Sequence, residues 1–194
     1  MKKLILAGLI AAACATPALA ALTAGDAAPD FTLKGSLEGK DFTFNLKTAL
    51  NNGPVVVYFF PSAFTGGCDA QAHAFAEDAD AFKAAGASII GVSGDSVERL
   101  HQFSADPNFC AGKFPVASDI DTKTAQSYKL NVSTPRAGAK DNKGNALDHA
   151  IIERVTYVIG RDGKVLATLS SAADKLSPID HVEKSLAMVQ NLKK

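Results

Sequence analysis

The sequence predicts an α/β domain built on a mixed β-sheet. Apolar segments that read as buried strands, such as 55–60 and 88–92, alternate with segments whose apolar residues recur at helical spacing. Near the C-terminus, two further β-rich segments flank a turn at 161–163, which predicts an antiparallel hairpin. Alternating strands and helices favour parallel strand neighbours, and the hairpin adds antiparallel ones. The sheet is therefore expected to contain both.

The first half of the chain supplies the opening strand, the central strand and a long helix. A loop at 24–29 leads into a short strand at 30–33, and turn residues at 51–54 precede the strand at 55–60. That strand is apolar on both faces, as expected of a covered, central strand. A helix is expected over 68–85, ending before Gly86. Its apolar face would consist of Cys68, Ala72, Phe75, Ala79 and Phe82.

The second half continues the alternation. The expected elements are a strand at 88–92, a helix capped by Asp95 or Ser96 and running through 103, a strand at 114–117, a helix at 121–128, hairpin strands at 155–159 and 164–169, and a helix from 178 to 192. Residues 131–148 are rich in Gly, Asn, Lys and Asp and predict a surface loop.

The first twenty residues have the features of a secretory signal peptide. Lys2 and Lys3 precede an apolar run that is shorter than the about 20 residues of a membrane span, and Ala18-Leu19-Ala20 fits the small-x-small pattern of a cleavage site. We expect cleavage after Ala20, leaving 21–194 as one exported domain, periplasmic or secreted. Two alternatives are lipidation at Cys14 and a buried N-terminal helix.

Composition and charge limit the classes of molecule that the mature chain is expected to bind. Removal of 1–20 takes away two lysines and no acidic residue, which leaves a formal charge of −2. Neither nucleic acid nor an anionic membrane surface is indicated as a partner, and no second apolar stretch could span a membrane. Cys68 and Cys110 would remain, and an oxidising compartment permits a disulfide between them.

Cys68 stands at the expected start of a helix, directly after a buried strand. Unpaired N–H groups and the positive end of the helix dipole favour a thiolate there, and the thiolate is the nucleophilic form. The preceding Gly67 lets the backbone approach a small ligand closely. The alternative is that Cys68 is a small core residue on the apolar face of the helix.

The segment Pro61-Ser62-Ala63-Phe64-Thr65-Gly66-Gly67-Cys68 resembles the active-site signature of peroxiredoxins. Residues 25–33 resemble the opening segment of that family, and 153–159 with 162–165 resemble its later strand pair. The resemblance is closest to the Q-type, or bacterioferritin comigratory protein, subgroup. It implies a thioredoxin-like fold, a monomer or weak dimer, and reduction of hydrogen peroxide or organic hydroperoxides without a cofactor. The reductant would be a thioredoxin-like protein or a low-molecular-weight thiol.

The resemblance also implies roles for four residues. Cys68 would attack the peroxide and become a sulfenic acid. Thr65 would hold the peroxide in line with its hydroxyl, Pro61 would cover the pocket, and Arg154 would stabilise the thiolate and the charge that develops as the O–O bond breaks. The alternatives are that Thr65 only caps the helix, that Pro61 only ends the strand, and that Arg154 lies on the surface.

The resolving cysteine is less clearly indicated. Some Q-type relatives carry it five residues after the first cysteine, where this chain has His73. Others carry it further along, so Cys110 is the candidate for an intramolecular disulfide. The alternative is that Cys110 packs beside Phe109 and Phe114 as a core residue, in which case an external thiol would reduce the sulfenic acid.

Three other functions compete with the peroxidase. A thioredoxin-type oxidoreductase needs Cys-x-x-Cys, whose first position is Thr65 here, and a copper-binding assembly protein needs two neighbouring cysteines. A glutathione peroxidase usually has an active-site Trp, and this chain has none. No metal is expected, because His73, His101, His149 and His181 show no ligand spacing.

Overall fold

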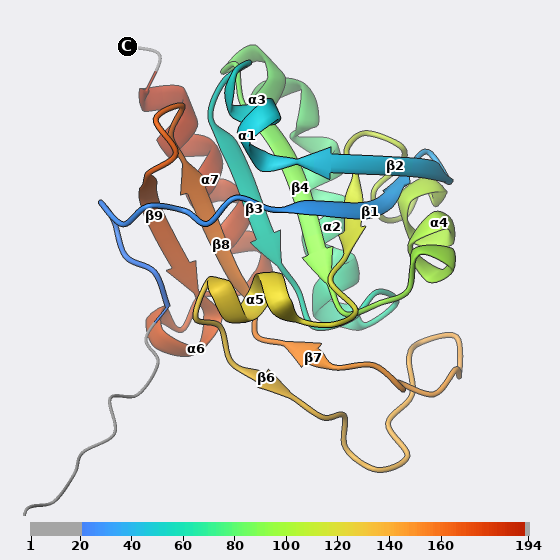
Figure 1. The fold of residues 1–194 in the computed structure, drawn as a ribbon. Coiled ribbons are helices and arrows are strands. Elements are labelled where there is room, and N and C mark those ends of the chain that lie inside the picture. The colour runs from blue at the N-terminus through green and yellow to red at the C-terminus, as the bar shows by residue number, and fades with distance from the viewer. Residues whose placement is uncertain (1–20, 193–194) are drawn as a thin grey trace, which may run out of the picture.

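The computed structural model describes residues 21–192, so the predicted signal peptide at 1–20, with the alternative site Cys14, lies outside the described residues. A seven-stranded sheet has the order β2-β1-β5-β4-β3-β8-β9 (Figure 1). At its centre, β3 (Val55–Phe59) runs parallel to β4 (Ser88–Ser93), which is parallel to β5 (Val116–Ser118). On the other side, β8 (Val155–Ile159) is antiparallel to both β3 and β9 (Val165–Ser170). The predicted mixed sheet is confirmed.

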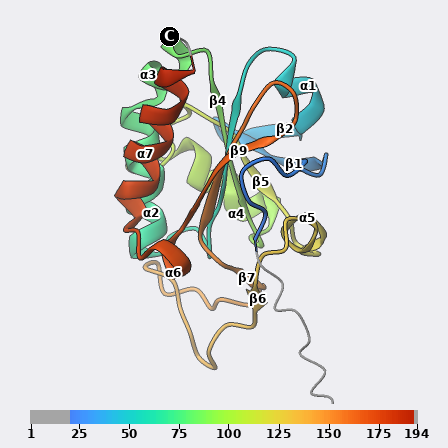
Figure 2. The ribbon, with the colours of Figure 1, turned by 90° about the vertical axis from the view of Figure 1, so that its left-hand side faces the viewer.

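Helices cover both faces of the sheet, as Figure 2 shows. One face carries α2 (Gly66–Glu77), α3 (Ala79–Ala84), α4 (Val97–Ala105) and α7 (Pro178–Asn191), and the other carries α1 (Leu46–Leu50) and α5 (Lys123–Ser127). The short α6 (Ser171–Asp174) follows β9. No helix in residues 21–192 is long and apolar enough to cross a membrane.

The N-terminal hairpin differs from the prediction. Instead of one strand at 30–33, the chain forms β1 (Thr32–Leu37) and β2 (Lys40–Asn45), paired along their length. The connecting residues Glu38 and Gly39 both have positive φ, at 54° and 74°. Two such residues form the tight turn whose twist suits a hairpin. The Glu-Gly pair is a weaker turn signal than Asn-Gly or Asp-Gly, so β2 was missed.

The helix expected over 68–85 is in fact two helices. It begins earlier, at Gly66, and the backbone leaves the helical conformation at Asp78, where φ is −91° and ψ is 2°. Asp favours such breaks because its side chain competes for backbone hydrogen bonds. Phe75 and Phe82, on either side of the break, are both fully buried against the sheet. Gly86, with φ of 79°, ends α3 as predicted.

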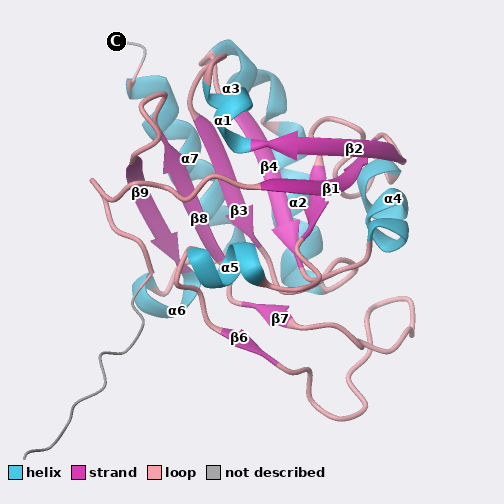
Figure 3. Cartoon of the chain, viewed as in Figure 1, coloured by secondary structure: helices cyan, strands magenta, loops and turns pink. Residues whose placement is uncertain are grey.

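Residues 131–148 are more ordered than a plain surface loop. The segment starts with β6 (Val132–Ser133), which pairs with β7 (Ile151–Ile152) in a separate two-stranded sheet, and Lys140 bridges Ala146. Figure 3 shows this small sheet below the main one, beyond the carboxyl ends of β3 and β4. The segment therefore lies at the end of the molecule where open α/β sheets place their ligand sites.

The core between the sheet and the α2–α3–α4–α7 layer is strongly aromatic. Tyr58 stacks on Phe75 with ring centroids 4.6 Å apart, and Phe64 meets Phe103 edge to face at 5.3 Å. Cys68 and Cys110 belong to this same buried cluster. Both cysteines therefore lie under one face of the sheet.

Candidate active site

Cys68 lies in the first turn of α2, just beyond the carboxyl end of β3. Phe64 turns the chain there with a positive φ of 59°, a conformation that a bulky residue adopts only when its surroundings hold it. Thr65 is extended and Gly66 begins the helix. The Cys68 side chain is only 2% exposed. The loop thus places a nearly buried thiol at a helix N-terminus, as the sequence predicted.

The guanidinium of Arg154 reaches across to this thiol. Its Nη2 atom lies 3.1 Å from Cys68 Sγ, and its Nη1 atom donates to the side-chain carbonyl of Gln71, one turn further along α2. A Cβ at Gly67 would lie 3.3 Å from Arg154 Nη2, so a glycine leaves room for the guanidinium. Arg154 is therefore not an isolated surface arginine: it joins β8 to the start of α2.

Gln71 is a site residue that the sequence analysis did not identify. It is fully buried, and its Nε2 atom has no hydrogen-bond partner in the described part of the chain. A buried polar side chain three residues after a helical Cys68 lies on the same helix face. The separation of three residues between Cys68 and Gln71 is a sequence signal for this position. The predicted helix face, which was defined by apolar residues, does not include it.

Thr65 and Pro61 lie on the other side of the cysteine loop. The Thr65 hydroxyl donates to the Ser62 carbonyl at 2.8 Å and makes no capping bond to α2, although Thr65 is the N-cap residue by its backbone. Its oxygen can still accept a hydrogen bond. Pro61 is half-buried, and both side chains line a pocket that the segment after β6 closes from the other side.

The buried carboxylate of Asp95 binds the loop that carries Cys68. Asp95 is fully buried; it accepts from the Ala63 N–H at 2.8 Å and pairs with Arg99 Nε at 2.7 Å and His149 Nε2 at 3.0 Å. Burial alone would raise the pKa of Asp95, but the hydrogen bonds from His149 and the backbone lower it overall. Asp95 was predicted only as a possible helix cap; the N-cap is Ser96.

Both ring nitrogens of His149 lie within hydrogen-bond distance of an acceptor. Its Nδ1 atom lies 2.9 Å from the Ala150 carbonyl, which can only accept, while Nε2 faces the Asp95 carboxylate. Burial would lower the pKa of His149, yet the hydrogen bond and the charge of Asp95 raise it above its ordinary value. The buried carboxylate thus favours the protonated form of the ring.

The 139–150 segment is tied to the cysteine loop at several further points. Asp141 pairs with Arg99 Nη2 at 2.7 Å, and the Asn142 N–H donates to the Phe64 carbonyl at 2.8 Å. Lys143 Nζ lies 3.6 Å from the centroid of the Phe64 ring. We refer to Asp95, Arg99, Asp141 and His149 as the anchor network. It fixes an insertion, for which the sequence predicted no role, onto the loop that carries Cys68.

Cys110 lies in the turns between α4 and β5 and is fully buried. It packs with Phe109 and Phe114 in the aromatic cluster, and both described cysteines are free thiols. Burial raises the pKa of the Cys110 thiol well above its ordinary value. This packing agrees with the core interpretation, while a resolving role for Cys110 stays a prediction.

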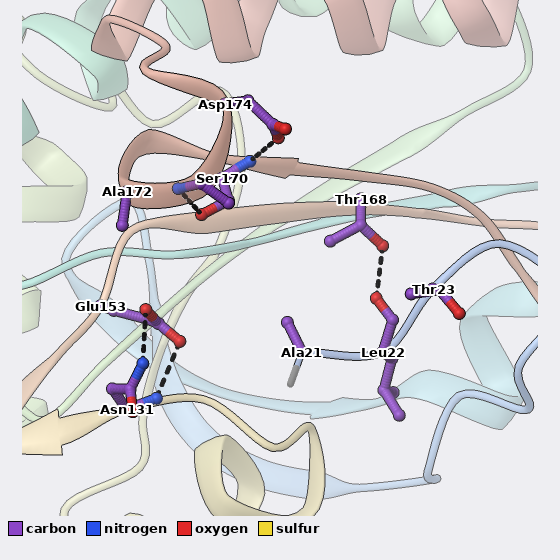
Figure 4. Close-up of a pocket in the computed structure, with 10 residues that line it drawn as sticks. Ala21, Leu22, Thr23, Asn131, Glu153, Thr168, Ser170, Ala172 and Asp174 are labelled. Atoms are coloured by element: carbon purple, nitrogen blue, oxygen red, sulfur yellow. Dashed lines mark hydrogen bonds between the residues drawn. The ribbon is translucent and has the colours of Figure 1, made fainter. Parts of the chain in front are cut away.

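Two other features do not contribute to the cysteine site. His73 is exposed and lies 3.6 Å from Glu77, and residues 21–192 contain no cluster of three or more His, Cys, Asp or Glu that could hold a metal. A separate pocket beside Leu22 contains no cysteine (Figure 4). Its polar groups pair with each other: Thr168 donates to the Leu22 carbonyl at 2.7 Å, and Asn131 donates twice to Glu153.

Comparison with known proteins agrees with this geometry. Residues 24–168 match the AhpC/TSA family. The chain is 31% identical to peroxiredoxin Bcp of Escherichia coli K12, covering 74% of this chain and 83% of that protein. It is 30% identical to chloroplastic peroxiredoxin Q of Sedum lineare, covering 90% and 81%.

Solved structures of proteins of the same type are also similar to this chain. Peroxidoxin BcpB of Mycobacterium tuberculosis superimposes with a TM-score of 0.72 at 28% identity, covering 89% of this chain and 99% of that one. The bacterioferritin comigratory protein of Xanthomonas campestris gives 0.64 at 28% identity, covering 84% and 92%. The fold is thioredoxin-like, and the chain belongs to the AhpC/TSA family, among peroxiredoxins of the Q and Bcp type.

Proposed function

We propose that this protein is a thiol-dependent peroxidase in which Cys68 is the peroxidatic residue. The thiolate of Cys68 attacks the terminal oxygen of a hydroperoxide, ROOH. The O–O bond breaks, the sulfur keeps the terminal OH as a sulfenic acid, and the other oxygen leaves as an alkoxide. The alkoxide takes up the proton that the Cys68 thiol gave up on ionisation and becomes the alcohol, or water when the substrate is hydrogen peroxide. The observation that carries this proposal is the 3.1 Å contact between Arg154 Nη2 and Cys68 Sγ at the start of α2.

The neighbouring groups suit the charges of that step. A guanidinium beside the sulfur stabilises the thiolate before attack and the leaving oxygen during it, and the N-terminal end of α2 acts in the same direction. Thr65 can orient the peroxide, because its hydroxyl oxygen has acceptor capacity left while its proton is held by Ser62. Pro61 shields the pocket and limits the access of water to the sulfenic acid.

For the second half of the cycle, we propose that Cys110 attacks the sulfenic sulfur of Cys68. A disulfide forms and water leaves; a thiol reductant then supplies two electrons to restore both thiols. In support, both cysteines belong to one buried cluster under the same face of the sheet. Since each thiol is packed by its neighbours, the first turn of α2 and the segment around Cys110 would have to open locally.

We further propose that the protein works outside the cytoplasm after removal of residues 1–20. The basic start, the short apolar run and the small residues before position 21 support export. An exported thiol peroxidase needs a reductant in the same compartment, either a thioredoxin-like protein or a low-molecular-weight thiol. No cofactor is required by the chemistry.

The test is peroxide-driven thiol loss in the mature protein, comparing the parent with Cys68→Ser and Cys110→Ser. We expect rapid loss of both thiols in the parent, no rapid loss in Cys68→Ser, and a Cys68–Cys110 disulfide by mass spectrometry. The Cys110→Ser variant should still consume Cys68 and leave it as sulfenic or sulfinic acid. If Cys68 in the parent reacts no faster than a free cysteine, the peroxidase proposal is wrong.

A further inference from the structure

The pocket beside the cysteine loop has two walls of different origin. Pro61 and Thr65 form the wall on the side of Cys68, and Pro135, Leu147 and Ile151, from the β6–β7 region, form the opposite wall. The anchor network holds the second wall in place, because it ties residues 141 and 149 to the cysteine loop. Both walls of the pocket are therefore held in fixed positions by the fold.

The pocket is larger than hydrogen peroxide needs. Its volume is about 330 Å³, whereas a water molecule occupies about 30 Å³ in the liquid. Five of its ten lining residues are aliphatic and four carry hydroxyl groups, so it offers both apolar surface for a carbon skeleton and polar groups that can orient a small ligand. The space next to Thr65 thus suits a hydroperoxide that carries an organic substituent.

One charged side chain lines this pocket. Among the described residues that line it, Arg136 is the one that is ionised at neutral pH. The Arg136 side chain is exposed, and within residues 21–192 it has no acidic partner in an ion pair. An unpaired guanidinium at the edge of this pocket is complementary to a carboxylate, which it can bind through two parallel hydrogen bonds.

We propose that this pocket selects organic hydroperoxides that bear a carboxylate, and that Arg136 pairs with that carboxylate while the carbon skeleton lies against Leu147 and Ile151. Hydroperoxides of fatty acids and of free amino acids belong to this chemical class. The inference rests on the proposed peroxidase function, since the hydroperoxide group would point past Thr65 toward Cys68. Arg136 is a specificity residue in this proposal and takes no part in breaking the O–O bond.

The test compares three peroxides: hydrogen peroxide, cumene hydroperoxide and its 4-carboxy derivative. The variants are Arg136→Gln, the charge-conserving Arg136→Lys, and Lys140→Gln as the matched control. Lys140 is an exposed cation of the same segment that does not line the pocket. Each kcat/KM is measured at low ionic strength, where pairing between exposed charges is least screened.

In the parent we expect the carboxylated peroxide to react up to about fivefold faster than cumene hydroperoxide, the upper end of what one exposed ion pair supplies. Arg136→Gln should abolish this preference, Arg136→Lys should keep most of it, and Lys140→Gln should keep all of it, with hydrogen peroxide unaffected throughout. The proposal is overturned if the parent shows no preference, or if Lys140→Gln loses as much as Arg136→Gln. A parent that reduces none of the three peroxides would instead overturn the peroxidase function itself.

Discussion

Arg154 Nη2 and Cys68 Sγ lie 3.1 Å apart although 86 positions separate the two residues in the chain. The contact exists because β8 lies next to β3 in the sheet, which brings the residue before β8 to the start of the helix that follows β3. The other guanidinium nitrogen is held by Gln71. Helix α2 therefore carries both the Cys68 thiol and the Gln71 side chain that orients the guanidinium of Arg154.

Replacing Arg154 is expected to slow the reaction of Cys68 with peroxide. Arg154→Gln should lower the second-order rate constant by about 100-fold, because loss of one preorganised charged donor costs about 3 kcal/mol. The rate constant of Arg154→Lys should lie between those of the parent and of Arg154→Gln, since a lysine keeps the charge but cannot contact Cys68 and Gln71 together. The chain has no Trp, so the rate is best measured by competition with catalase for hydrogen peroxide.

The control for this experiment is Arg161→Gln. Arg161 is an exposed arginine beyond the opposite end of β8 from Arg154; it donates to the Asn51 carbonyl and takes no part in the hydrogen bonds around Cys68. It should react at the parental rate. Equal rates for Arg154→Gln and the parent would remove Arg154 from the chemistry.

Gln71 is expected to act through Arg154. In Gln71→Leu the guanidinium loses one of its two partners, so its orientation toward Cys68 is less fixed, and we expect the peroxide rate constant to fall about tenfold, the value of one hydrogen bond to a charged group. Gln71→Glu keeps an acceptor and should retain more of the rate than Gln71→Leu. Because Gln71 is buried, the free energy of unfolding of each variant is measured alongside. A Gln71→Leu variant that is less stable but reacts at the parental rate would show a merely structural role.

The sequence was sufficient for the local parts of this site and insufficient for its long-range parts. The strand-turn-helix that presents Cys68 could be predicted because apolar runs, glycines and Pro61 are all near in the chain. Arg154 was selected by resemblance, not by spacing. Asp95, Arg99 and His149 were not recognised as one network, because contacts such as Ser62 with His149 span 87 positions and leave no periodic signal.

The same reasoning explains the errors in the fold. The hairpin of β1 and β2 depends on a two-residue turn at Glu38 and Gly39, and the strand-favouring run Phe42-Thr43-Phe44 is too short to predict β2 without that turn. The break at Asp78 interrupts an apolar pattern that is otherwise continuous through Phe75 and Phe82. In both places the outcome depends on the backbone conformation of one or two residues, which the apolar pattern does not indicate.

Disulfide formation, if Cys110 resolves Cys68, is expected to loosen two segments together. Both thiols are buried among aromatic side chains, so a bond between them requires the first turn of α2 and the turns around Cys110 to leave their packed positions. Hydrogen exchange of the peroxide-treated protein should therefore be faster at 62–72 and 106–113 than in the reduced protein, with β8 and β9 unchanged. Cys110→Ser treated in the same way is the control and should show no increase at 106–113.

The pairing of Asp95 with His149 predicts a stability contribution confined to an intermediate pH range. The raised pKa of His149 stabilises the fold below the ordinary histidine value of about 6.5 and this contribution is lost as the pH rises through the folded value. The lowered pKa of Asp95 stabilises the fold above its ordinary value of about 3.9 and this contribution is lost as the pH falls. The network is thus most stabilising between these limits.

His149→Gln tests this window, since an amide can bond Asp95 without a charge. The melting temperature of the parent should exceed that of His149→Gln by more at pH 5.5 than at pH 8.5. The exposed His101, which lies 2.9 Å from Asp41, provides the control His101→Gln, with a smaller difference at either pH. A gap between parent and His149→Gln that does not change with pH would mean that folding leaves the pKa of His149 unchanged, and a smaller gap at pH 5.5 would mean that the ring is neutral in the folded protein.

His181 is expected to have the opposite pH dependence. It is a fully buried residue of α7, with Nδ1 3.0 Å from the Thr156 hydroxyl and Nε2 3.0 Å from the Ser171 hydroxyl. Burial, together with the charge of Arg154, lowers its pKa to about 4. The folded protein therefore keeps this ring neutral, while the unfolded chain takes up a proton below about pH 6.5. Stability is lost as the pH falls from 6.5 toward 4, by about 3 kcal/mol in total. His181→Gln cannot take up that proton; although it should be less stable than the parent at pH 7, its denaturant midpoint should fall less between pH 7 and pH 4.5. Equal falls in the two proteins would place the acid sensitivity in the carboxylates, Asp95 first among them, and not in His181.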